Sequence, residues 1–574
     1  QKNVTLTIYE DEVVVQGGYS LEAGTLDLNG RTLIIMGDLI HSGGMLNVNG
    51  GKLIVKGDYR IQKKEGEGYT YSNGLVKMDN AADHILVEGD FVMDSRFQHK
   101  ENYLSAGTVE IKGNFIQKST SGTGYYNFSP EGQHKVILSG SGPQSVNFED
   151  AGTSHFNILE ITNPDPSQIT FNHGEPTTSN IVYSGDVLTL RDVNIGLVGL
   201  TLPMDMKLIF SEGFAFELGT GTDSHERLNL NGHTLTVEGD FIHSGSMLNI
   251  NGGKLIIKGD YRLQKETDDG GYTYSNGTVK MSNETDYILI EGDFVMDSKW
   301  THNGVCGTQG FSAGMLEIKG DFSQKSSAYS SGLVCNSQSN FQAKGTHRTL
   351  LSGLGLQQVT FEDAGASRFN ILEITNPDPT QIVFSPAEPT TSNIVCDGLL
   401  TLRDLNIGQV GMKLIRDMKV VLSEGAAFGL YGETLDLNGH TLTVEGDLLQ
   451  SGGMLNINGG KLIVKGDYRI QKQAENGSYT YSSGYLRMVN EADHILVQGD
   501  FIMDSRSSHK EFLTAGTLEL KGDFFQKTAV DKGSGESENF LASETHKVLL
   551  SGSGPQTVFF EDAGSSDSWH SHFN

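Results

Sequence analysis

Pairs of neighbouring carboxylic acids recur three times in this chain, always in a segment that reads Phe-Glu-Asp-Ala-Gly. The pairs are Glu149-Asp150, Glu362-Asp363 and Glu561-Asp562. Paired carboxyl groups carry out the acid and base catalysis of many polysaccharide hydrolases. As catalysts these pairs would form three tandem active sites, whereas a carboxylate at the end of a strand can simply accept hydrogen bonds from turn amides. We favour this structural role and predict that the protein is not an enzyme and has no catalytic residue.

Histidines also recur at equivalent places. One set precedes a predicted strand, is followed by Lys or Arg and shows no carboxylate partner in the local sequence: His134, His347 and His546. Another set, His84 and His494, is matched by Tyr287 in the middle of the chain, which argues against a catalytic histidine. A metal site is conceivable at His570 and His572, beside Trp569, but we favour a frayed chain end there.

Gly-Asp turns are the other source of candidate ligands. Their carboxylates suit Ca²⁺, because hard cations favour oxygen ligands. Nothing in their spacing gathers five or six oxygens in one place, and the P-loop, HExxH, EF-hand and paired CxxC motifs do not occur. We predict no cofactor and no specific metal site, with loosely bound calcium as the alternative.

Long loops rich in aromatic residues follow successive predicted strands, and we expect them to leave the same corner of the fold. Aromatic side chains on loops beside a rigid scaffold are candidates for a ligand platform. The competing interpretation, which we favour, is that they cap the side of the structure and shield its strand edges. The possible ligand edge comprises Tyr69, Tyr71, Tyr125, Tyr272, Tyr274, Trp300, Tyr479 and Tyr481.

These residues recur because the chain is nearly three copies of one unit. The segment LDLNGRTLIIMGDLIHSGG, which begins at Leu26, returns in close variants at Leu228 and Leu435. The long period is therefore 202 and then 207 residues. We divide the chain into the tail of a preceding unit (1–25), two full units (26–227 and 228–434) and a truncated third unit (435–574).

A shorter period of about 20 residues lies inside each unit and separates Gly37-Asp38 from Gly57-Asp58. Leu235 and Val237 alternate with polar residues, which is the period of two of a half-buried strand. A piece this short cannot close a core alone, so successive pieces must stack in register. The sequence predicts an all-β fold, a right-handed parallel β-helix (β-solenoid) with coils of about 20–25 residues and loops stacked on one edge.

Asparagines recur at the tight turns between the predicted strands. Asn-Gly tolerates positive φ at low cost, so these residues suit the turns. Stacking of the coils would place them one above the other, with hydrogen bonds along the axis. The stacked pairs are Asn29 with Asn49, Asn231 with Asn251 and Asn438 with Asn458.

A repeat of this length, rich in LxLNG and VxGD, resembles the right-handed β-helical repeats of filamentous-haemagglutinin-like adhesins and other large bacterial surface proteins. The segment FNILEITN (residues 156–163) is similar to repeats of secreted bacterial β-helical proteins. The resemblance implies a structural segment, acting as stalk, filament or adhesin, that is extracellular or at the cell surface. It carries over no catalytic or binding residue. The alternatives are a carbohydrate-binding adhesin that uses the aromatic edge and, further off, a β-helical polysaccharide lyase or hydrolase.

The charge and hydrophobicity of the sequence limit the partners that the chain can bind. The chain holds 71 Asp and Glu against 42 Lys and Arg, a net charge of −29 that repels nucleic acid and anionic membranes. No stretch approaches the roughly 18 apolar residues of a membrane span. We predict no nucleic-acid partner and no membrane insertion. The predicted partners are further repeats of the same chain or end-to-end self-association, through unpaired strands, and polysaccharide or a cell-surface glycan.

Only three cysteines occur. Cys306 and Cys335 lie in two loops that are enlarged only in the middle copy, and both loops are expected at the same corner of neighbouring coils. We predict a disulfide between them, with two independent free thiols as the alternative. Cys396 takes the place of Tyr183 within a predicted strand, so we expect a buried free thiol.

Overall fold

The computed structural model describes residues 4–100, 102–122, 126–171, 176–178, 180–196, 199–219, 226–300, 310–328, 337–385, 387–391, 393–408, 410–528, 537–561, 563 and 570–574. Packing divides the chain into two compact units, residues 1–280 with 285–288 and residues 281–284 with 289–574. This division falls inside the second sequence copy, so the compact units and the repeat copies partition the chain differently.

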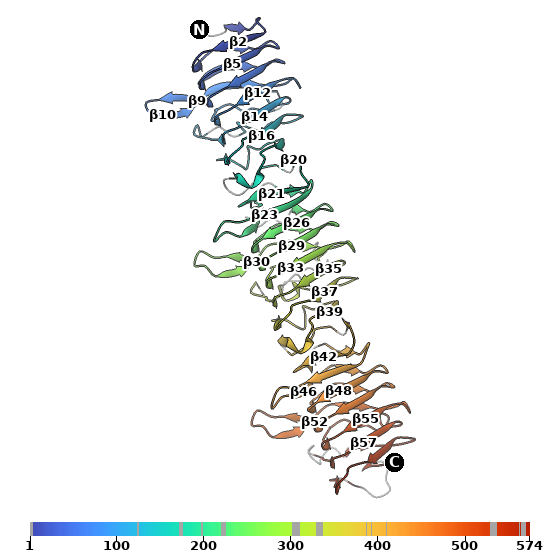
Figure 1. Cartoon of the computed structure of the whole chain (residues 1–574). Coiled ribbons are helices and arrows are strands. Elements are labelled where there is room, and N and C mark those ends of the chain that lie inside the picture. Colours follow the sequence, from blue (N-terminus) through green and yellow to red (C-terminus); the bar gives the residue numbers. More distant parts are fainter. Residues whose placement is uncertain are drawn as a thin grey trace. The chain divides into compact units, whose positions relative to one another are not determined.

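The first compact unit is built from coils of three short strands. One coil consists of β4 (Thr25–Asp27), β5 (Thr32–Ile35) and β6 (Leu39–His41), and the next of β7 (Gly43–Asn47), β8 (Lys52–Val55) and β9 (Tyr59–Glu65). Each strand pairs in parallel with its counterpart one coil further on, as Thr32 pairs with Lys52. The predicted parallel β-solenoid is therefore confirmed, and Figure 1 shows the strands of successive coils side by side.

Three sheets run along the first copy. The first contains β1 (Thr5–Thr7), β4, β7 and β11 (Asn73–Lys77). The second contains β2 (Glu12–Val15), β5, β8, β12 (His84–Val87), β14 (Thr108–Ile111), β16 (Lys135–Leu138), β18 (Ile158–Ile161) and β20 (Ile181–Tyr183). The third begins with β3 (Tyr19–Leu21), β6, β9, β13 (Phe91–Met93), β15 (Phe115–Gln117), β17 (Gln144–Phe148) and β19 (Ile169–Phe171).

Three ladders continue through the rest of the first compact unit. One contains β21 (Val187–Arg191), β23 (Asp205–Ile209), β26 (Thr234–Glu238) and β29 (Lys254–Ile257). A second contains β22 (Leu200–Thr201), β25 (Glu226–Asn229), β28 (Met247–Asn249) and β32 (Thr278–Lys280). The third contains β24 (Phe216–Leu218), β27 (Phe241–His243) and β30 (Tyr261–Glu266).

The second compact unit repeats this plan. Its first ladders contain β35 (Met315–Ile318), β37 (Arg348–Leu351), β39 (Ile371–Ile374) and β41 (Ile394–Cys396), and β34 (Phe294–Met296), β36 (Phe322–Gln324), β38 (Gln357–Phe361) and β40 (Ile382–Ser385). The division of the chain falls within β33 (Tyr287–Ile290), the strand that precedes β35 in its ladder. A ladder that begins at the end of the second copy and runs into the third contains β42 (Leu400–Arg403), β45 (Met418–Val421), β48 (Thr441–Glu445), β51 (Lys461–Val464), β55 (His494–Val497), β57 (Thr517–Leu520) and β60 (Lys547–Leu550). Beside them lie β43 (Asn406–Ile407), β46 (Ala427–Leu430), β49 (Asp447–Gln450), β52 (Tyr468–Gln473), β56 (Phe501–Met503), β58 (Phe524–Gln526) and β61 (Val558–Phe560). The remaining strands are β44 (Met412–Lys413), β47 (Thr434–Asp436), β50 (Met454–Asn456), β54 (Tyr485–Arg487), β59 (Ser537–Leu541) and β62 (His570–His572).

Helical structure in the described residues is limited to single 3₁₀ turns, η1 (Pro166–Gln168), η3 (Ser337–Ser339) and η4 (Pro379–Gln381). In η1 the side chain of Asp165 accepts a hydrogen bond from the amide of Ser167 and caps the turn. No helix in this part of the chain is long and apolar enough to cross a membrane.

Coil length varies more than the sequence suggested. Successive turns are 20 residues apart between Asp38 and Asp58 but 37 residues apart between Asp321 and Gln358. The predicted upper limit of about 25 residues is therefore wrong for several coils. The strands keep their register because the added residues leave as loops between them.

The core is the column of side chains that alternate inward along each strand. In β5, β8 and β12 every second residue is buried, and Leu33, Leu53 and Ile85 lie in register one above the other. Aromatic rings continue the column along the next face: the Phe91 and Phe115 ring centroids are 5.8 Å apart. One coil buries little by itself, so its stability depends on the coils on either side of it.

The turn asparagines adopt the left-handed conformation that was predicted, with φ of 50° at Asn29 and 48° at Asn49. Their side chains do bond along the axis, but not to each other. Asn49 Nδ2 donates to Asp27 Oδ1 of the preceding coil at 3.0 Å, and Asn29 Nδ2 donates to the Ile8 carbonyl at 3.3 Å. The asparagine turns and their stacking one above the other are thus confirmed, and the axial hydrogen bonds go to an aspartate or a carbonyl of the preceding coil instead of the stacked asparagine.

The faces of the solenoid change where the first copy gives way to the second. β5 and its counterparts form the sheet that ends at β20, yet β26, the second-copy counterpart of β5, extends the ladder through β19, β21 and β23. A single residue pair, Thr170 with Arg191, joins β19 to β21. The class of strand that includes β5 and β26 therefore moves to another ladder at this boundary.

Long loops leave one corner and stack there, as predicted. Ser72 forms a parallel bridge with Ser95 of the next coil, and Asn127 Nδ2 donates to the Ser95 carbonyl at 3.2 Å. The stacked loops are therefore joined by hydrogen bonds that continue the order of the strands.

Candidate functional site

Three β-hairpins project from the coils, one in each sequence copy, and we call them the tyrosine arms. Each is an antiparallel pair in an otherwise parallel fold: β9 with β10 (Gly68–Tyr71), β30 with β31 (Tyr272–Tyr274), and β52 with β53 (Tyr479–Tyr481). Figure 1 shows the first arm extending beyond the stacked strands. Among the described residues, the arms are the strands that leave the solenoid as regular structure.

Each arm grows out of a strand whose first residues belong to the core. Tyr59 is fully buried at the start of β9, while the same strand is exposed from Lys63 onward. The chain turns back at Gly66, where φ is 63°, a conformation that favours glycine. Tyr69 and Tyr71 are then two residues apart and lie on the same side of β10.

An arginine links each arm to the solenoid. The Arg60 guanidinium lies 5.1 Å from the centre of the Tyr69 ring, and its Nη2 donates to Asp58 Oδ2 at 2.7 Å. The second and third copies repeat this contact at 5.1 and 4.8 Å, with Arg262 on Tyr272 and Arg469 on Tyr479. This arginine was not among the site residues predicted from the sequence. The motif Gly-Asp-Tyr-Arg, which occurs in all three copies, could have indicated it.

The structure brings together six of the eight aromatic residues proposed from the sequence, as three pairs. Tyr125 lies outside the described residues. Trp300 lies in the loop after β34 rather than on an arm, and Lys299 Nζ is 5.7 Å from its ring. The arm tyrosines are between 36% and 44% exposed, so they do not fill the core. They are Tyr69, Tyr71, Tyr272, Tyr274, Tyr479 and Tyr481.

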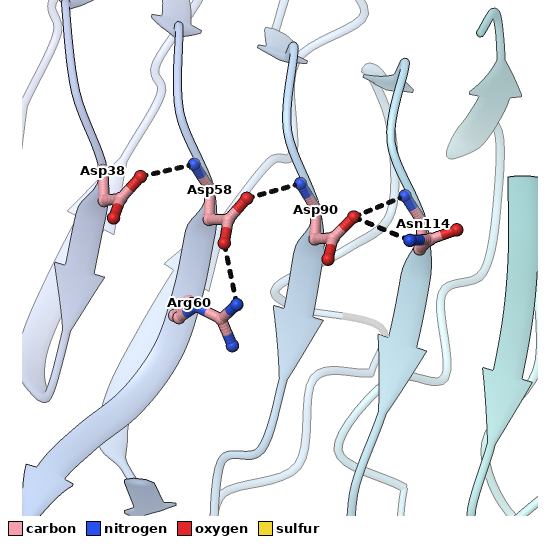
Figure 2. Close-up of polar contacts among 5 residues, drawn as sticks. All are labelled: Asp38, Asp58, Arg60, Asp90 and Asn114. Atoms are coloured by element: carbon pink, nitrogen blue, oxygen red, sulfur yellow. Dashed lines mark hydrogen bonds and ion pairs between the residues drawn. The ribbon is translucent and has the colours of Figure 1, made fainter. Parts of the chain in front are cut away.

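A ladder of carboxylates runs along the turn from which the arms start (Figure 2). The Asp58 amide donates to Asp38 Oδ1 at 2.9 Å, and the Asp90 amide donates to Asp58 Oδ1 at 2.8 Å. Asn114 continues this run: it donates its amide and its Nδ2 to Asp90 Oδ1, both at 2.9 Å, and its Oδ1 accepts the Ser145 amide at 2.7 Å. Each bond joins one coil to the next, and we call the series the aspartate ladder.

The aspartate ladder recurs in the other copies. The Asp260 amide donates to Asp240 Oδ1 at 2.8 Å in the second copy, and the Asp467 amide donates to Asp447 Oδ1 at 2.8 Å in the third. A Cβ atom on Gly57, Gly259 or Gly466 would lie closer than 3.0 Å to the carboxylate that precedes it in the ladder. The glycine of each of these three turns therefore leaves room for the carboxylate of the coil before.

The paired carboxylates have the structural role that we favoured. Glu149 accepts the amide of Ser119 at 3.0 Å, Glu362 that of Ser326 at 2.6 Å, and Glu561 that of Thr528 at 2.8 Å. Asp150 Oδ2 accepts a hydrogen bond from Thr153 at 2.6 Å. Asp562 lies outside the described residues.

The recurring histidines before a strand are buried beside phenylalanine rings. His134 Nδ1 bonds the Ala106 carbonyl at 2.9 Å, and His347 and His546 bond Ala313 and Ala515 in the same way. Burial lowers the pKa of His134 and His347 to about 4 and lowers that of His546. They are therefore neutral core residues at neutral pH.

The histidines that are partly or fully exposed face carboxylates or pair as strand residues. His84 Nε2 lies 3.3 Å from Glu110, and His494 Nε2 lies 3.1 Å from Glu519. The frayed end expected at His570 and His572 is wrong, because these residues form β62, which pairs with β59. Trp569 lies outside the described residues.

Candidate metal ligands and cysteine thiols are the remaining reactive groups in the described part of the chain. No group of three or more His, Cys, Asp or Glu side chains there is placed to hold a metal ion. Cys396 is a buried free thiol, as predicted, and Arg416 Nη1 lies 3.4 Å from its sulfur. Cys306 and Cys335 fall outside the described residues, so their disulfide stays a prediction.

Comparison with known proteins identifies no relative: no family model, no curated protein and no solved structure matches the chain.

Replacing both Tyr69 and Tyr71 with Ala should lower stability by less than about 2 kcal/mol, because exposed cross-strand and cation–π contacts contribute about 0.2–1 kcal/mol each. Urea unfolding of the parent and the double variant measures the difference. The matched control is Tyr59→Ala in the same arm, where loss of a buried ring should cost about 3–5 kcal/mol. A loss of more than about 2 kcal/mol in the double variant would mean that the arm caps the core.

Proposed function

We propose that the chain is a non-catalytic structural segment of a secreted or cell-surface bacterial protein, serving as a stalk, filament or adhesin. The observation that carries this proposal is the aspartate ladder. In all three copies the amide at the Gly-Asp turn of one coil donates to the carboxylate of the coil before, at 2.8 or 2.9 Å in the first copy. Contacts that recur along the axis resist separation of neighbouring coils, which is what a load-bearing segment requires.

The other recurring polar groups support the same proposal. The paired carboxylates bond turn amides in every copy, and the recurring histidines bond a carbonyl of the preceding coil. These side chains join one coil to its neighbour, so their repetition serves assembly of the solenoid.

Stretching single chains from both ends in an optical trap tests the structural role. We expect discrete unfolding events as groups of coils detach, because neighbouring coils are joined by many backbone and carboxylate hydrogen bonds in parallel. A Gly/Ser linker of 574 residues is the control, and it should extend smoothly. Smooth extension of the protein at the same force as the linker would refute a load-bearing role.

A carbohydrate-binding adhesin is the second candidate, and the tyrosine arms favour it. Each arm presents two tyrosines that are more than a third exposed, on a hairpin fixed to the solenoid by an arginine. Exposed aromatic side chains with a polar neighbour are common in sites that bind ligands in contact with water.

A further inference from the structure

A hollow lies at the base of the third tyrosine arm, and Asp447 of the aspartate ladder forms part of its wall. Its volume is about 390 Å³, within the range of about 300–1,000 Å³ that is usual for small-molecule sites. The wall includes the segment before β46, the Gly-Asp turn before β49 and the arm itself. The polar and aromatic residues of the wall are Ser423, Tyr431, Glu445, Asp447, Arg469, Gln473 and Tyr479.

Three substitutions distinguish the wall beside the third arm from the equivalent place beside the second arm. The segment SEGFAFELG (211–219), at the end of the first unit, corresponds to SEGAAFGLY (423–431), at the end of the second. Phe214, which is 64% exposed, becomes Ala426, Glu217 becomes Gly429, and Gly219 becomes Tyr431. The place beside the third arm therefore lacks two large side chains and has one additional aromatic ring.

The gained ring lies where the lost carboxylate was attached. A Cβ atom on Gly429 would collide with the ring of Tyr431, so this ring needs the glycine beneath it. At the second arm, Glu217 instead lies near Glu266 of that arm, and burial together with this like charge raises the Glu217 pKa. Gln473 replaces Glu266 in the third copy, which removes both members of that repulsive pair.

The wall offers both hydrogen-bond acceptors and donors. Asp447 is exposed; its Oδ1 accepts the Asp467 amide at 2.8 Å, which leaves Oδ2 without a hydrogen bond among the described residues. Arg469 donates from Nη2 to Asp467. Gln473 and the tyrosine hydroxyls add further donors and acceptors to the wall. Glu445 adds a second carboxylate to the wall, and Lys419 Nζ lies 3.2 Å from its Oε1. Because Asp447 and Arg469 carry opposite charges and Glu445 is paired with Lys419, the wall suits a neutral ligand with many hydroxyls better than an ion.

We propose that this hollow binds one neutral hexopyranose unit of a polysaccharide. The sugar hydroxyls donate to Asp447 and accept from Arg469 or Gln473, and the apolar face of the sugar ring packs on Tyr431 or Tyr479. This inference rests on the second candidate function, the carbohydrate-binding adhesin, and narrows it to the third copy. The load-bearing role does not depend on it.

Saturation-transfer NMR on the whole chain, with methyl glucoside, galactoside and mannoside as separate probes, tests the proposal. We expect saturable binding of at least one probe in the millimolar range, as is usual for a single sugar unit. Tyr479→Ala should weaken binding at least about tenfold, equivalent to about 1.4 kcal/mol. The triple variant Ala426→Phe, Gly429→Glu, Tyr431→Gly carries the residues found at the equivalent place beside the second arm, and it should abolish binding.

The controls separate loss of the site from loss of the fold. Tyr9→Ala removes an aromatic ring that is 77% exposed far along the sequence, and its binding should equal that of the parent. The triple variant uses residues that the same fold already holds beside the second arm. Its thermal unfolding midpoint should therefore match that of the parent. If it does not fold, Tyr479→Ala still decides, because Tyr479 is an exposed arm residue.

Three outcomes would overturn the proposal: no saturable binding of any neutral probe, binding that persists in a folded triple variant, or binding of tetramethylammonium without any sugar. The last would identify a cation site formed by aromatic rings and carboxylates. Each of these results leaves the pulling experiment unaffected, so the hollow and the structural role can fail separately.

Discussion

Acidification from about pH 7.5 to about pH 5 should destabilise the protein strongly, because protons enter the unfolded chain at histidines that are neutral in the core. Burial lowers the pKa of these histidines from 6.5 to about 4. At His99 the neutral form is also required for a hydrogen bond, since Nε2 accepts the Val76 amide at 3.1 Å. The five histidines are His41, His99, His134, His347 and His509.

The direction of the effect follows from the two pKa values. Between pH 6.5 and about 4 the unfolded chain binds more protons at these sites than the folded chain does. Their stabilising contribution is complete above pH 6.5 and is lost as the pH falls toward 4. At about pH 5 each histidine should lose about 2 kcal/mol of folding free energy.

His41→Gln isolates one of these contributions, and the third copy supplies the precedent. His41 bonds the Tyr59 hydroxyl at 3.1 Å and the Gly44 carbonyl at 3.3 Å. Gln450, its counterpart, accepts from Tyr468 at 2.6 Å and donates to Gly453 at 3.3 Å, so glutamine fills this place with equivalent partners. Urea unfolding of His41→Gln should show about 2 kcal/mol less acid destabilisation than the parent at about pH 5. An unchanged dependence on pH would show that His41 does not titrate on unfolding.

Gly259→Ala should be among the most damaging single-methyl changes in the chain. The added Cβ would lie closer than 3.0 Å to Asp240 Oδ1, the atom that accepts the Asp260 amide at 2.8 Å. Either the carboxylate or the turn must move, and both break the aspartate ladder. We expect a loss of about 2–4 kcal/mol, from one charged hydrogen bond and local overpacking. The urea midpoint and the exchange rate of the Asp260 amide measure it.

The chain contains a matched control one coil earlier. Gly239 occupies the same Gly-Asp turn, but a Cβ there meets only a ring carbon of Phe210, at 3.7 Å. Neither glycine has a positive φ, so alanine is acceptable to the backbone at both places. Gly239→Ala should therefore leave the stability and the Asp260 amide exchange nearly unchanged. Equal losses in the two variants would attribute the effect to the turn backbone instead of the ladder.

The strands and their stacking could be predicted because both leave a period in the sequence. Alternation at Leu235 and Val237 gave the inward face of β26, and the 20-residue spacing of Gly-Asp gave the register of neighbouring coils. The left-handed asparagine turns followed from Asn-Gly, since few other residues take that conformation easily. These are local preferences that every copy repeats.

The arms and the ladder could not be predicted to the same extent, because they depend on contacts between coils. The sequence marked Tyr69 and Tyr71 as loop residues, and nothing in their spacing showed that β9 would continue outward and pair with β10. It also showed Asp38 and Asp58 as turn residues without showing that one accepts the amide of the other. The hollow at the third arm required a comparison of copies at Gly429 and Tyr431, together with the position of the tyrosine ring.

The aspartate ladder also gives the solenoid a direction of growth. In each step described above, the carboxylate belongs to the earlier coil and the amide to the later one, as in Asp38 with Asp58 and Asp58 with Asp90. A coil that has already closed thus presents a fixed acceptor to the next segment of chain. When a chain emerges N-terminus first, each new coil can fold onto the one before it without waiting for the rest. A long polymer of such coils can then be made without ever exposing more than one unfinished edge.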